Sequence, residues 1–166
     1  PKPIQQPGPP LWIGGRSQAA LQRVGRLGDG WLASFITPKE SGQGIHAIRR
    51  YAELAGRTIP EDHYGTFISC AITDSEAEAT RALALFTNPR RDGVNPGAHS
   101  VFGSPEKIIS RIREYQEEGV TKFVLRPVCT PESWTAQVER LAKEVIIPVQ
   151  TPFSQEELEQ RAGTTL

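Results

Sequence analysis

Four consecutive residues near the start of the chain, Gly14, Gly15, Arg16 and Ser17, have the composition of a turn that binds phosphate. The preceding residues, 11–13, form a short apolar run after two prolines, which predicts a strand buried on both faces. Ser17 has the side chain of a helix N-cap, so the turn would join this strand to a helix. The N–H groups and the dipole of a helix N-terminus favour a bound phosphate, and Arg16 would add a full positive charge. The same residue types also occur in strand-to-helix turns that bind nothing.

The elements that would position this turn alternate along the chain as helices and strands. Leu21, Val24 and Leu27 recur at three-residue intervals and predict an amphipathic helix directly after the turn. Elsewhere, β-branched and aromatic residues predict strands, and periodic stretches bounded by glycine or proline predict helices. We expect further strands at 31–36, 64–72 and 120–125 and further helices at 44–55, 75–86, 104–118 and 131–145.

This alternation predicts parallel β-α units. Periodicity alone leaves two architectures open, an open α/β sheet or part of a (β/α)8 barrel. Residues 88–100 interrupt the alternation with two Asn-Pro steps and two glycines, so we expect a long loop there. Arg90, Arg91 and His99 are candidate ligand contacts if this loop lies over an active site, and a solvated loop is the simpler interpretation.

The composition indicates one soluble domain and excludes several kinds of partner. The chain has 166 residues, and its 19 basic and 19 acidic residues create no large field that would attract nucleic acid or a membrane surface. No run of about 18 apolar residues predicts a membrane span, and the N-terminus lacks the apolar core of a signal peptide. Cys70 and Cys129 are expected to be free thiols of a cytoplasmic protein rather than a disulfide or a metal site. The absence of methionine leads us to expect that the sequence belongs to a longer chain.

Two blocks of the sequence resemble one enzyme family. The run LWIGGRSQAALQRVGRLGDGWL, residues 11–32, is similar to the strand, GG-x-S turn and GDGW motif of the bacterial-luciferase-like flavin-dependent oxidoreductases and monooxygenases. The run FGSPEKIISRIREYQEEGVTKFVLRP, residues 102–127, resembles the closing helix and last barrel strand of the same family. The resemblance implies a TIM-type (β/α)8 barrel, of which residues 9–147 would form the C-terminal half, about four β-α units, since a complete barrel needs about 250 residues. Residues 1–8 would be a linker and 148–166 a polar tail.

The resemblance also implies functional roles for particular residues. Gly14, Gly15, Arg16 and Ser17 match the positions where the family holds the phosphate of its cofactor. Ser34, with Phe35 beside it, would end the next strand against the flavin ring or the substrate. Arg126 would end the last strand and pair with an anionic group of the cofactor or substrate, or else form a salt bridge at the barrel rim. The catalytic residues are not identified by these motifs, and no metal site is expected.

The implied reaction is electron or hydride transfer through FMN, or through an 8-hydroxy-5-deazaflavin coenzyme as the alternative, acting on a small organic substrate. An isolated half barrel would expose two strand edges and an apolar interior, so we expect a homo-oligomer or pairing with the missing N-terminal half. A second hypothesis is a non-catalytic half-barrel module that self-associates and binds a phosphorylated ligand. A third is an unrelated open α/β domain that binds phosphate.

Overall fold

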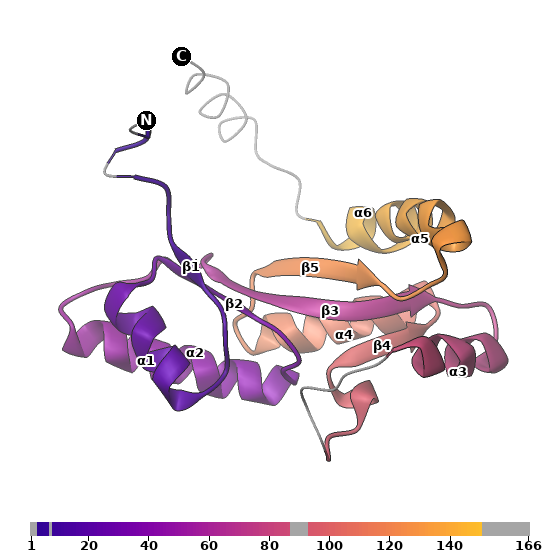
Figure 1. Ribbon diagram of the computed structural model, residues 1–166, viewed down its shortest axis with the longest axis horizontal. Helices are drawn as coiled ribbons and strands as arrows, with labels where there is room; N and C mark the ends of the chain where they lie inside the picture. Colours follow the sequence, from indigo (N-terminus) through magenta and orange to yellow (C-terminus); the bar gives the residue numbers. More distant parts are fainter. Residues whose placement is uncertain (1–2, 7, 87–92, 151–166) are drawn as a thin grey trace.

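The computed structural model describes residues 3–6, 8–86 and 93–150, and its centre is a five-stranded sheet in which every strand pair is parallel (Figure 1). The strands are β1 (Trp12–Ile13), β2 (Gly30–Ala33), β3 (Tyr64–Ile72), β4 (Ser100–Gly103) and β5 (Lys122–Pro127). The longer helices are α1 (Gln18–Leu27), α2 (Pro38–Leu54), α3 (Glu76–Leu85), α4 (Pro105–Glu117) and α5 (Trp134–Arg140). Short helical segments lie at Pro96–Ala98, Pro131–Ser133, Leu141–Ile146 and, as α6, Ile147–Val149.

β3 is the central strand because both of its edges have partners. Gly65 and Thr66 pair with β2 and also with β5, so these two strands lie on opposite edges of β3. Ser69 and Cys70 pair with β4 and also with β5, so β4 follows β2 along the same edge of β3. Within the described residues, β1 pairs only with β2 and β5 pairs only with β3, which leaves one edge of each without a partner strand there.

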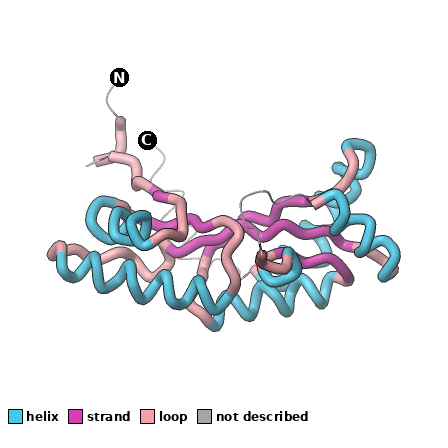
Figure 2. The backbone as a smooth tube through the Cα atoms, turned by 60° about the horizontal axis from the view of Figure 1, so that its bottom comes forward, coloured by secondary structure: helices cyan, strands magenta, loops and turns pink. Residues whose placement is uncertain are grey.

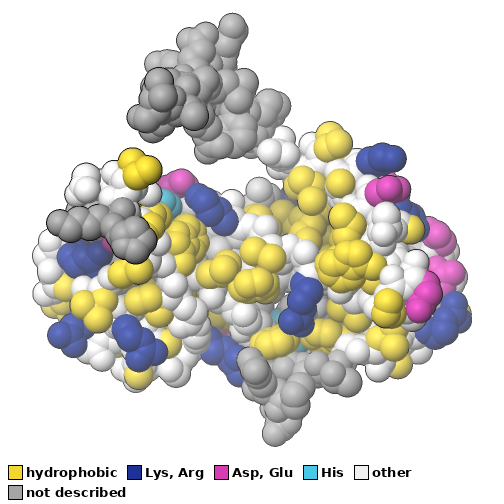
Figure 3. Space-filling view, turned by 45° about the horizontal axis from the view of Figure 1, so that its top comes forward, with side chains coloured by type: hydrophobic (Ala, Val, Ile, Leu, Met, Phe, Trp, Pro, Cys, Tyr) yellow, Lys and Arg dark blue, Asp and Glu magenta, His cyan; other side chains and the backbone are white. Residues whose placement is uncertain are grey.

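Helices cover one face of the sheet and bury the main core between the two layers (Figure 2). The almost fully buried residues come from both layers and include Val24, Trp31, Ile48, Tyr64, Ile68, Ile108, Ile112 and Tyr115. Tyr115 of α4 also donates a hydrogen bond from its hydroxyl to the Ile36 carbonyl oxygen, 2.5 Å away, which ties the helix to the loop after β2. Much of the opposite face is open, and hydrophobic side chains gather across the molecule in Figure 3. Val124 on that side of β5 is 40% exposed.

The first strand is shorter and more exposed than its apolar residues predict. Leu11 lies outside β1 and is 61% exposed, and Trp12 and Ile13 are only partly buried. The expectation of a strand buried on both faces is therefore wrong. β1 is an edge strand, and β2 covers only one of its edges.

Helix α2 begins at Pro38 rather than at residue 44 because Thr37 and Glu40 form a capping box. The Glu40 N–H donates to Thr37 Oγ1 over 3.2 Å, and the Thr37 N–H donates to Glu40 Oε2 over 2.8 Å. Pro38 at the first helical position suits this start, since its missing N–H would have had no intrahelical partner.

Strand β4 is a second departure from the sequence-based expectation. It begins at Ser100, the last residue of the loop predicted over 88–100, and pairs with the end of β3. A four-residue strand is too short to show a periodicity of its own. Residues 87–92, which include Arg90 and Arg91, lie outside the described residues.

Both cysteines are free, as expected. Cys70 is buried in the middle of β3, and this burial raises the pKa of its thiol to about 12. Cys129 follows β5 and is partly buried. In the part of the chain that the structure describes, no helix is both long enough and apolar enough to cross a membrane.

Candidate functional site

The turn between β1 and α1 has a backbone conformation that requires glycine at one position. Gly15 has a φ of +105°, and a Cβ atom at this residue would lie 2.8 Å from Cβ of Ala20. Both the dihedral angle and the contact exclude a larger residue without a shift of the turn. The requirement for Gly15 is therefore explained by the turn itself, and ligand binding has to be argued from other features.

The core fixes the direction of one peptide group in this turn. The indole Nε1 of Trp31, a fully buried side chain, donates a hydrogen bond to the Gly15 carbonyl oxygen over 2.7 Å. In a planar trans peptide the carbonyl and the following N–H point in opposite directions. Because the carbonyl of Gly15 points toward the core, the N–H of Arg16 points away from it, toward solvent.

Ser17 caps α1 as its side chain predicts. Its Oγ accepts a hydrogen bond from the Ala20 N–H over 3.3 Å, and its carbonyl accepts one from the Leu21 N–H over 3.0 Å. The N–H groups of Gln18 and Ala19, in the first turn of the helix, have no carbonyl within the helix to bond. The turn is solvent-exposed from Gly14 to Ser17, so an anion can approach these donors directly.

A second group of candidate residues lies where β2, β3 and β5 approach their carboxyl ends. It lines a cavity of about 300 Å³ formed by Ser34, Phe35, Phe67, Ser69, His99 and Arg126. The structure therefore brings together Ser34 and Arg126, two predicted site residues from distant parts of the sequence. Phe35, next to Ser34, has a φ of +53° and is the only described residue other than glycine with a positive φ. Strain of this kind costs about 1–3 kcal/mol and often marks a functional position.

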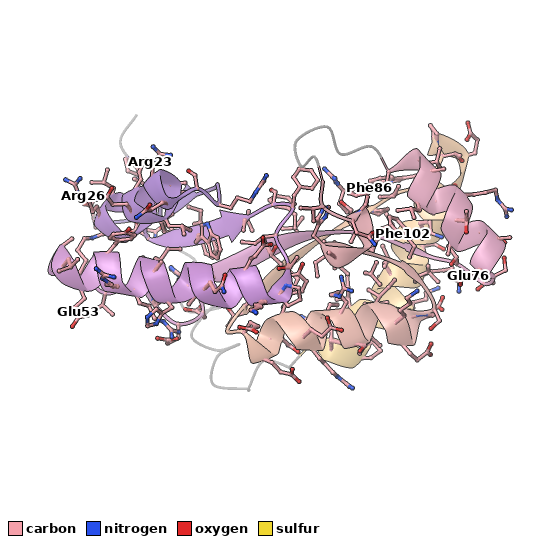
Figure 4. The ribbon with its side chains drawn as sticks, turned by 90° about the horizontal axis from the view of Figure 1, so that it is seen from below. Arg23, Arg26, Glu53, Glu76, Phe86 and Phe102 are labelled. Atoms are coloured by element: carbon pink, nitrogen blue, oxygen red, sulfur yellow. The ribbon has the colours of Figure 1, made fainter. Side chains whose placement is uncertain are left out.

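Aromatic rings form one wall of this cavity and continue behind it. The ring of His99 lies 5.8 Å from the ring of Phe35 and 6.0 Å from the ring of Phe86, measured between centroids. Phe86 and Phe102 lie close together between α3 and β4, with their centroids 5.9 Å apart (Figure 4). His99 itself is 2% exposed.

The turn between β1 and α1 lies near this cavity, but the two do not form a single pocket. Arg16 lines a separate hollow of about 270 Å³ between the turn and α2, with Ile36 and Glu40 among its walls. The loop that follows β2 separates the two, since Ser34 lines the cavity and Ile36 lines the hollow.

Sequence reasoning missed Phe67 and Ser69. They lie two residues apart on β3, so their side chains project to the same face of the sheet. In the parallel register, Ser69 lies directly opposite Arg126 of β5. The alternation of side chains between the two faces of strand 64–72 places Phe67 and Ser69 on one face. This pattern could have identified both residues once Arg126 was a candidate.

The opposite, amino-terminal end of the sheet carries charges that are paired. Asp29 accepts a hydrogen bond from the Leu11 N–H over 2.9 Å and forms an ion pair with Arg57 at 3.1 Å. Lys122 forms an ion pair with Asp62 at 2.9 Å. The hydrogen bond from Lys122 lowers the pKa of Asp62 below its usual range, against the weaker opposing effect of desolvation.

The described residues contain no cluster of three or more His, Cys, Asp or Glu side chains that could hold a metal ion. The chemistry available at the carboxyl ends of the strands is therefore that of backbone N–H groups, hydroxyls, arginine and aromatic rings. Such a set is chemically suited to an anionic, partly aromatic ligand.

Solved structures with the same fold are enzymes about twice as long as this chain. F420-dependent tetrahydromethanopterin reductase from Methanopyrus kandleri is 20% identical with a TM-score of 0.64, and the match covers 85% of this chain and 51% of that one. An F420-dependent secondary alcohol dehydrogenase in complex with an F420-acetone adduct is 17% identical with a TM-score of 0.69, over 88% of this chain and 50% of that one. The chain thus spans about half the length of these structures.

A further solved structure with this fold is the oxygenating constituent of 3,6-diketocamphane monooxygenase from the CAM plasmid of Pseudomonas putida, in complex with FMN. It is 17% identical with a TM-score of 0.64, over 87% of this chain and 50% of that one. These similarities confirm the predicted α/β class, a parallel half of a TIM-type (β/α)8 barrel. A family model described as luciferase-like monooxygenase matches residues 1–99. The chain therefore belongs to the luciferase-like monooxygenase family.

Proposed function

We propose that this chain is the C-terminal portion of a flavin- or deazaflavin-dependent oxidoreductase and that it contributes the pocket for the cofactor's phosphate. Gly14, Gly15, Arg16 and Ser17 would hold that phosphate. The observation that carries the proposal is the hydrogen bond from Trp31 to the Gly15 carbonyl oxygen, because it fixes the Arg16 N–H outward beside the N-terminus of α1.

The residues of the turn fit a phosphate group in three respects. The turn is exposed, so no side chain has to move before an anion approaches. The Arg16 N–H and the first-turn N–H groups of α1 supply donors, and the dipole of a ten-residue helix adds partial positive charge. The Ser17 hydroxyl accepts from Ala20 through its oxygen, which leaves its own O–H able to donate to a ligand.

The bound cofactor would supply the electron or hydride transfer, and the chain would fix and orient it. With the phosphate at the β1–α1 turn, the cavity beside it is placed to receive the ring or the substrate. Ser34 would lie at the mouth of that space and Arg126 on its far side, on β5. FMN is our first choice and the 8-hydroxy-5-deazaflavin coenzyme is the alternative, since relatives of both kinds share the fold.

The open side of the sheet supports a role for a further barrel half. β1 and β5 each present an unpaired edge within the described residues. Beside β5 runs an apolar groove of about 280 Å³, and Trp134 and Val138 on its helical wall are 49% and 42% exposed. A second copy of the chain or an N-terminal half of the barrel would cover these surfaces. In this proposal residues 9–147 form the half barrel, flanked by a linker, 1–8, and a polar tail, 148–166.

The test is a comparison of FMN with riboflavin, which lacks the phosphate, by quenching of flavin fluorescence during titration. We expect the wild-type chain to bind FMN at least about tenfold more tightly than riboflavin. The double substitution Arg16→Ala and Ser17→Ala should remove most of this preference. The 8-hydroxy-5-deazaflavin coenzyme, titrated in the same way, identifies which cofactor binds more tightly.

A matched control replaces an arginine and a serine that are three residues apart on α4. Ser110→Ala with Arg113→Ala alters exposed residues far from the turn and should leave the FMN to riboflavin ratio unchanged. A double variant at 16 and 17 that keeps the wild-type ratio would overturn the assignment of the phosphate site. We also expect no turnover from this chain alone with reduced FMN and oxygen, and robust turnover would contradict its role as a partial barrel.

A further inference from the structure

Arg126 is held in a fixed orientation on the open face of the sheet. It lies at the carboxyl end of β5, directly opposite Ser69 on β3. Its Nε and Nη2 groups both donate to the Ser69 Oγ, over 3.2 and 2.8 Å. The guanidinium also lies over the ring of Phe35, with its Cζ atom 5.5 Å from the ring centroid. Two neighbours, Ser69 on β3 and Phe35 in the loop after β2, therefore set the direction of this side chain.

The charge of Arg126 is not neutralised by any described carboxylate. Arg126 is itself exposed, and two less exposed arginines of the protein do have such partners: Arg57 pairs with Asp29 at 3.1 Å and Arg140 pairs with Asp74 at 3.0 Å. Ser69 is neutral, so it orients the guanidinium without cancelling its charge. Among the described residues, the salt bridge at the barrel rim that the sequence left open as an alternative is not formed.

The donors that remain on Arg126 form a fork. Ser69 uses the Nε–H and one N–H of Nη2, which leaves Nη1 and the other N–H of Nη2 at the end of the guanidinium. These donors are coplanar and suit the two oxygens of a carboxylate, which a guanidinium binds in bidentate fashion. Phe35, Phe67 and His99 line the same cavity and offer apolar and aromatic surface to the rest of the ligand.

We propose that this cavity binds an organic acid with an aromatic or other apolar body, whose carboxylate is held by Arg126. The role of this acid as the substrate of the oxidoreductase rests on the proposed function. Binding of the acid itself does not depend on the cofactor. Ser69 is a positioning residue, because it acts on the ligand by orienting Arg126.

The proposal is tested with benzoate as the probe and benzamide as its neutral analogue, titrated into the 166-residue chain in whatever assembly it forms. Binding is followed by isothermal titration calorimetry and by the NMR signal of the Arg126 Nε–H. We expect benzoate to bind at least about tenfold more tightly than benzamide. Arg126→Gln should abolish that preference, and Arg126→Lys should restore little of it because an ammonium group lacks the fork. Ser69→Ala should weaken benzoate binding by about threefold to tenfold while benzamide binding stays the same.

Several results would overturn the proposal. Equal affinities for benzoate and benzamide would show that the charge is not recognised, and an unchanged preference in Arg126→Gln would place the anion elsewhere. Competition by inorganic phosphate at equal concentration would show a general anion site instead of a carboxylate site. Arg113→Gln, an exposed arginine of α4, is the control and should bind both probes like the wild type.

The two proposals fail separately. Arg126→Gln should keep the preference for FMN over riboflavin, whereas the double variant at Arg16 and Ser17 should keep the preference for benzoate over benzamide. If Arg126→Gln does not fold, the Arg126 Nε–H signal of the wild type still decides the question. A shift that saturates with benzoate and not with benzamide supports the site, and no shift with benzoate rejects it.

Discussion

The two ends of the parallel sheet use polar side chains in opposite ways. At the amino-terminal end, Asp29 pairs with Arg57 and accepts a hydrogen bond from the Leu11 N–H just before β1, and Lys122 pairs with Asp62. At the carboxyl-terminal end, Arg126 has only the neutral Ser69 as a hydrogen-bond partner among the described residues. Asp29 and Lys122 at the amino end are matched by partners in the described residues, and at the carboxyl end Asp74 is likewise paired with Arg140. Arg126 differs from them because no described carboxylate pairs with it, and in our proposal a ligand supplies that partner.

Two positive φ values, at Gly15 and Phe35, follow the carboxyl ends of strands. Positive φ values also occur on the amino side, at Gly56 and Gly119, but there the residue is glycine, and Phe35 is the only described non-glycine residue with one. Closed ion pairs favour stability, whereas unmatched donors and unusual dihedral angles cost stability and suit binding. We therefore expect substitutions at the amino end to change the free energy of unfolding alone and substitutions at the carboxyl end to change ligand binding as well.

The largest effect is expected for Gly15→Ala. The new methyl group would combine a φ of +105° with a 2.8 Å contact to Ala20, and we expect a loss of about 3 kcal/mol in the free energy of unfolding. FMN affinity should also fall by at least about tenfold, because the Arg16 N–H would be displaced. Urea unfolding and FMN titration measure the two effects.

Gly56→Ala is the matched control for that variant. Gly56 has a φ of +65° after α2, and a Cβ atom there would meet nothing within 4 Å. It should cost about 1 kcal/mol of stability and leave FMN binding unchanged. If both glycine variants bind FMN like the wild type, the turn has no special role at the carboxyl end.

The next effect in size is expected for Asp29→Ala at the amino end. The substitution removes the ion pair with Arg57 and leaves the Leu11 N–H without its acceptor, so unfolding should become easier by about 2 kcal/mol. The FMN to riboflavin ratio should not change. Asp74→Ala, which removes an exposed ion pair with Arg140, should cost less than about 1 kcal/mol. A larger loss for Asp74→Ala than for Asp29→Ala would contradict the stabilising role of the amino end.

The smallest effect concerns acid sensitivity at Asp62. The pKa of this carboxyl is lower in the folded state, so its pair with Lys122 stabilises the fold above about pH 4 and loses that contribution as pH falls through the folded-state pKa. Asp62 is exposed, so the contribution is below about 0.5 kcal/mol. Asp62→Asn should therefore flatten the decline in unfolding free energy between about pH 5 and pH 2. Gln116→Ala, which changes an exposed uncharged side chain of α4, should follow the wild-type profile. If Asp62→Asn also follows it, the pair with Lys122 does not contribute to acid sensitivity.

The sequence predicts the alternating elements because periodicity reports the core face directly. Residues 64–72 form the predicted strand, and the helix after Ser17 has the predicted cap. The start of α2 differs from the prediction although its capping box, Thr37 with Glu40, is readable in the sequence, because the apolar periodicity of this helix begins only at Ile45. β4 had no readable signal, since its four residues are defined by pairing with β3 and not by their own pattern.

The candidate site was predicted in parts and not as a whole. Ser34 and Arg126 line the same cavity because β2 and β5 pair with opposite edges of the amino-terminal part of β3. This placement follows from the order of the strands in the sheet. Ser69 can be recognised as a site residue only from the strand register, which places it opposite Arg126. The grouping of residues that are far apart in sequence therefore required the strand order, which no local pattern contains.

The order of partners along β3 also bears on how new specificities can arise in this architecture. β2 pairs with β3 only up to Thr66, and β4 takes over the same edge from Ser69 onward. The two strands diverge where the cavity opens, with Phe35 on the β2 side and His99 on the β4 side. Changes in the length or composition of the segment that carries β4 would reshape the gap between β2 and β4, while the pairing of the barrel strands stays the same. If the cavity binds a ligand as we propose, selection can change its specificity without rebuilding the sheet, because the residues of the β4 segment and the barrel strands are separate stretches of chain.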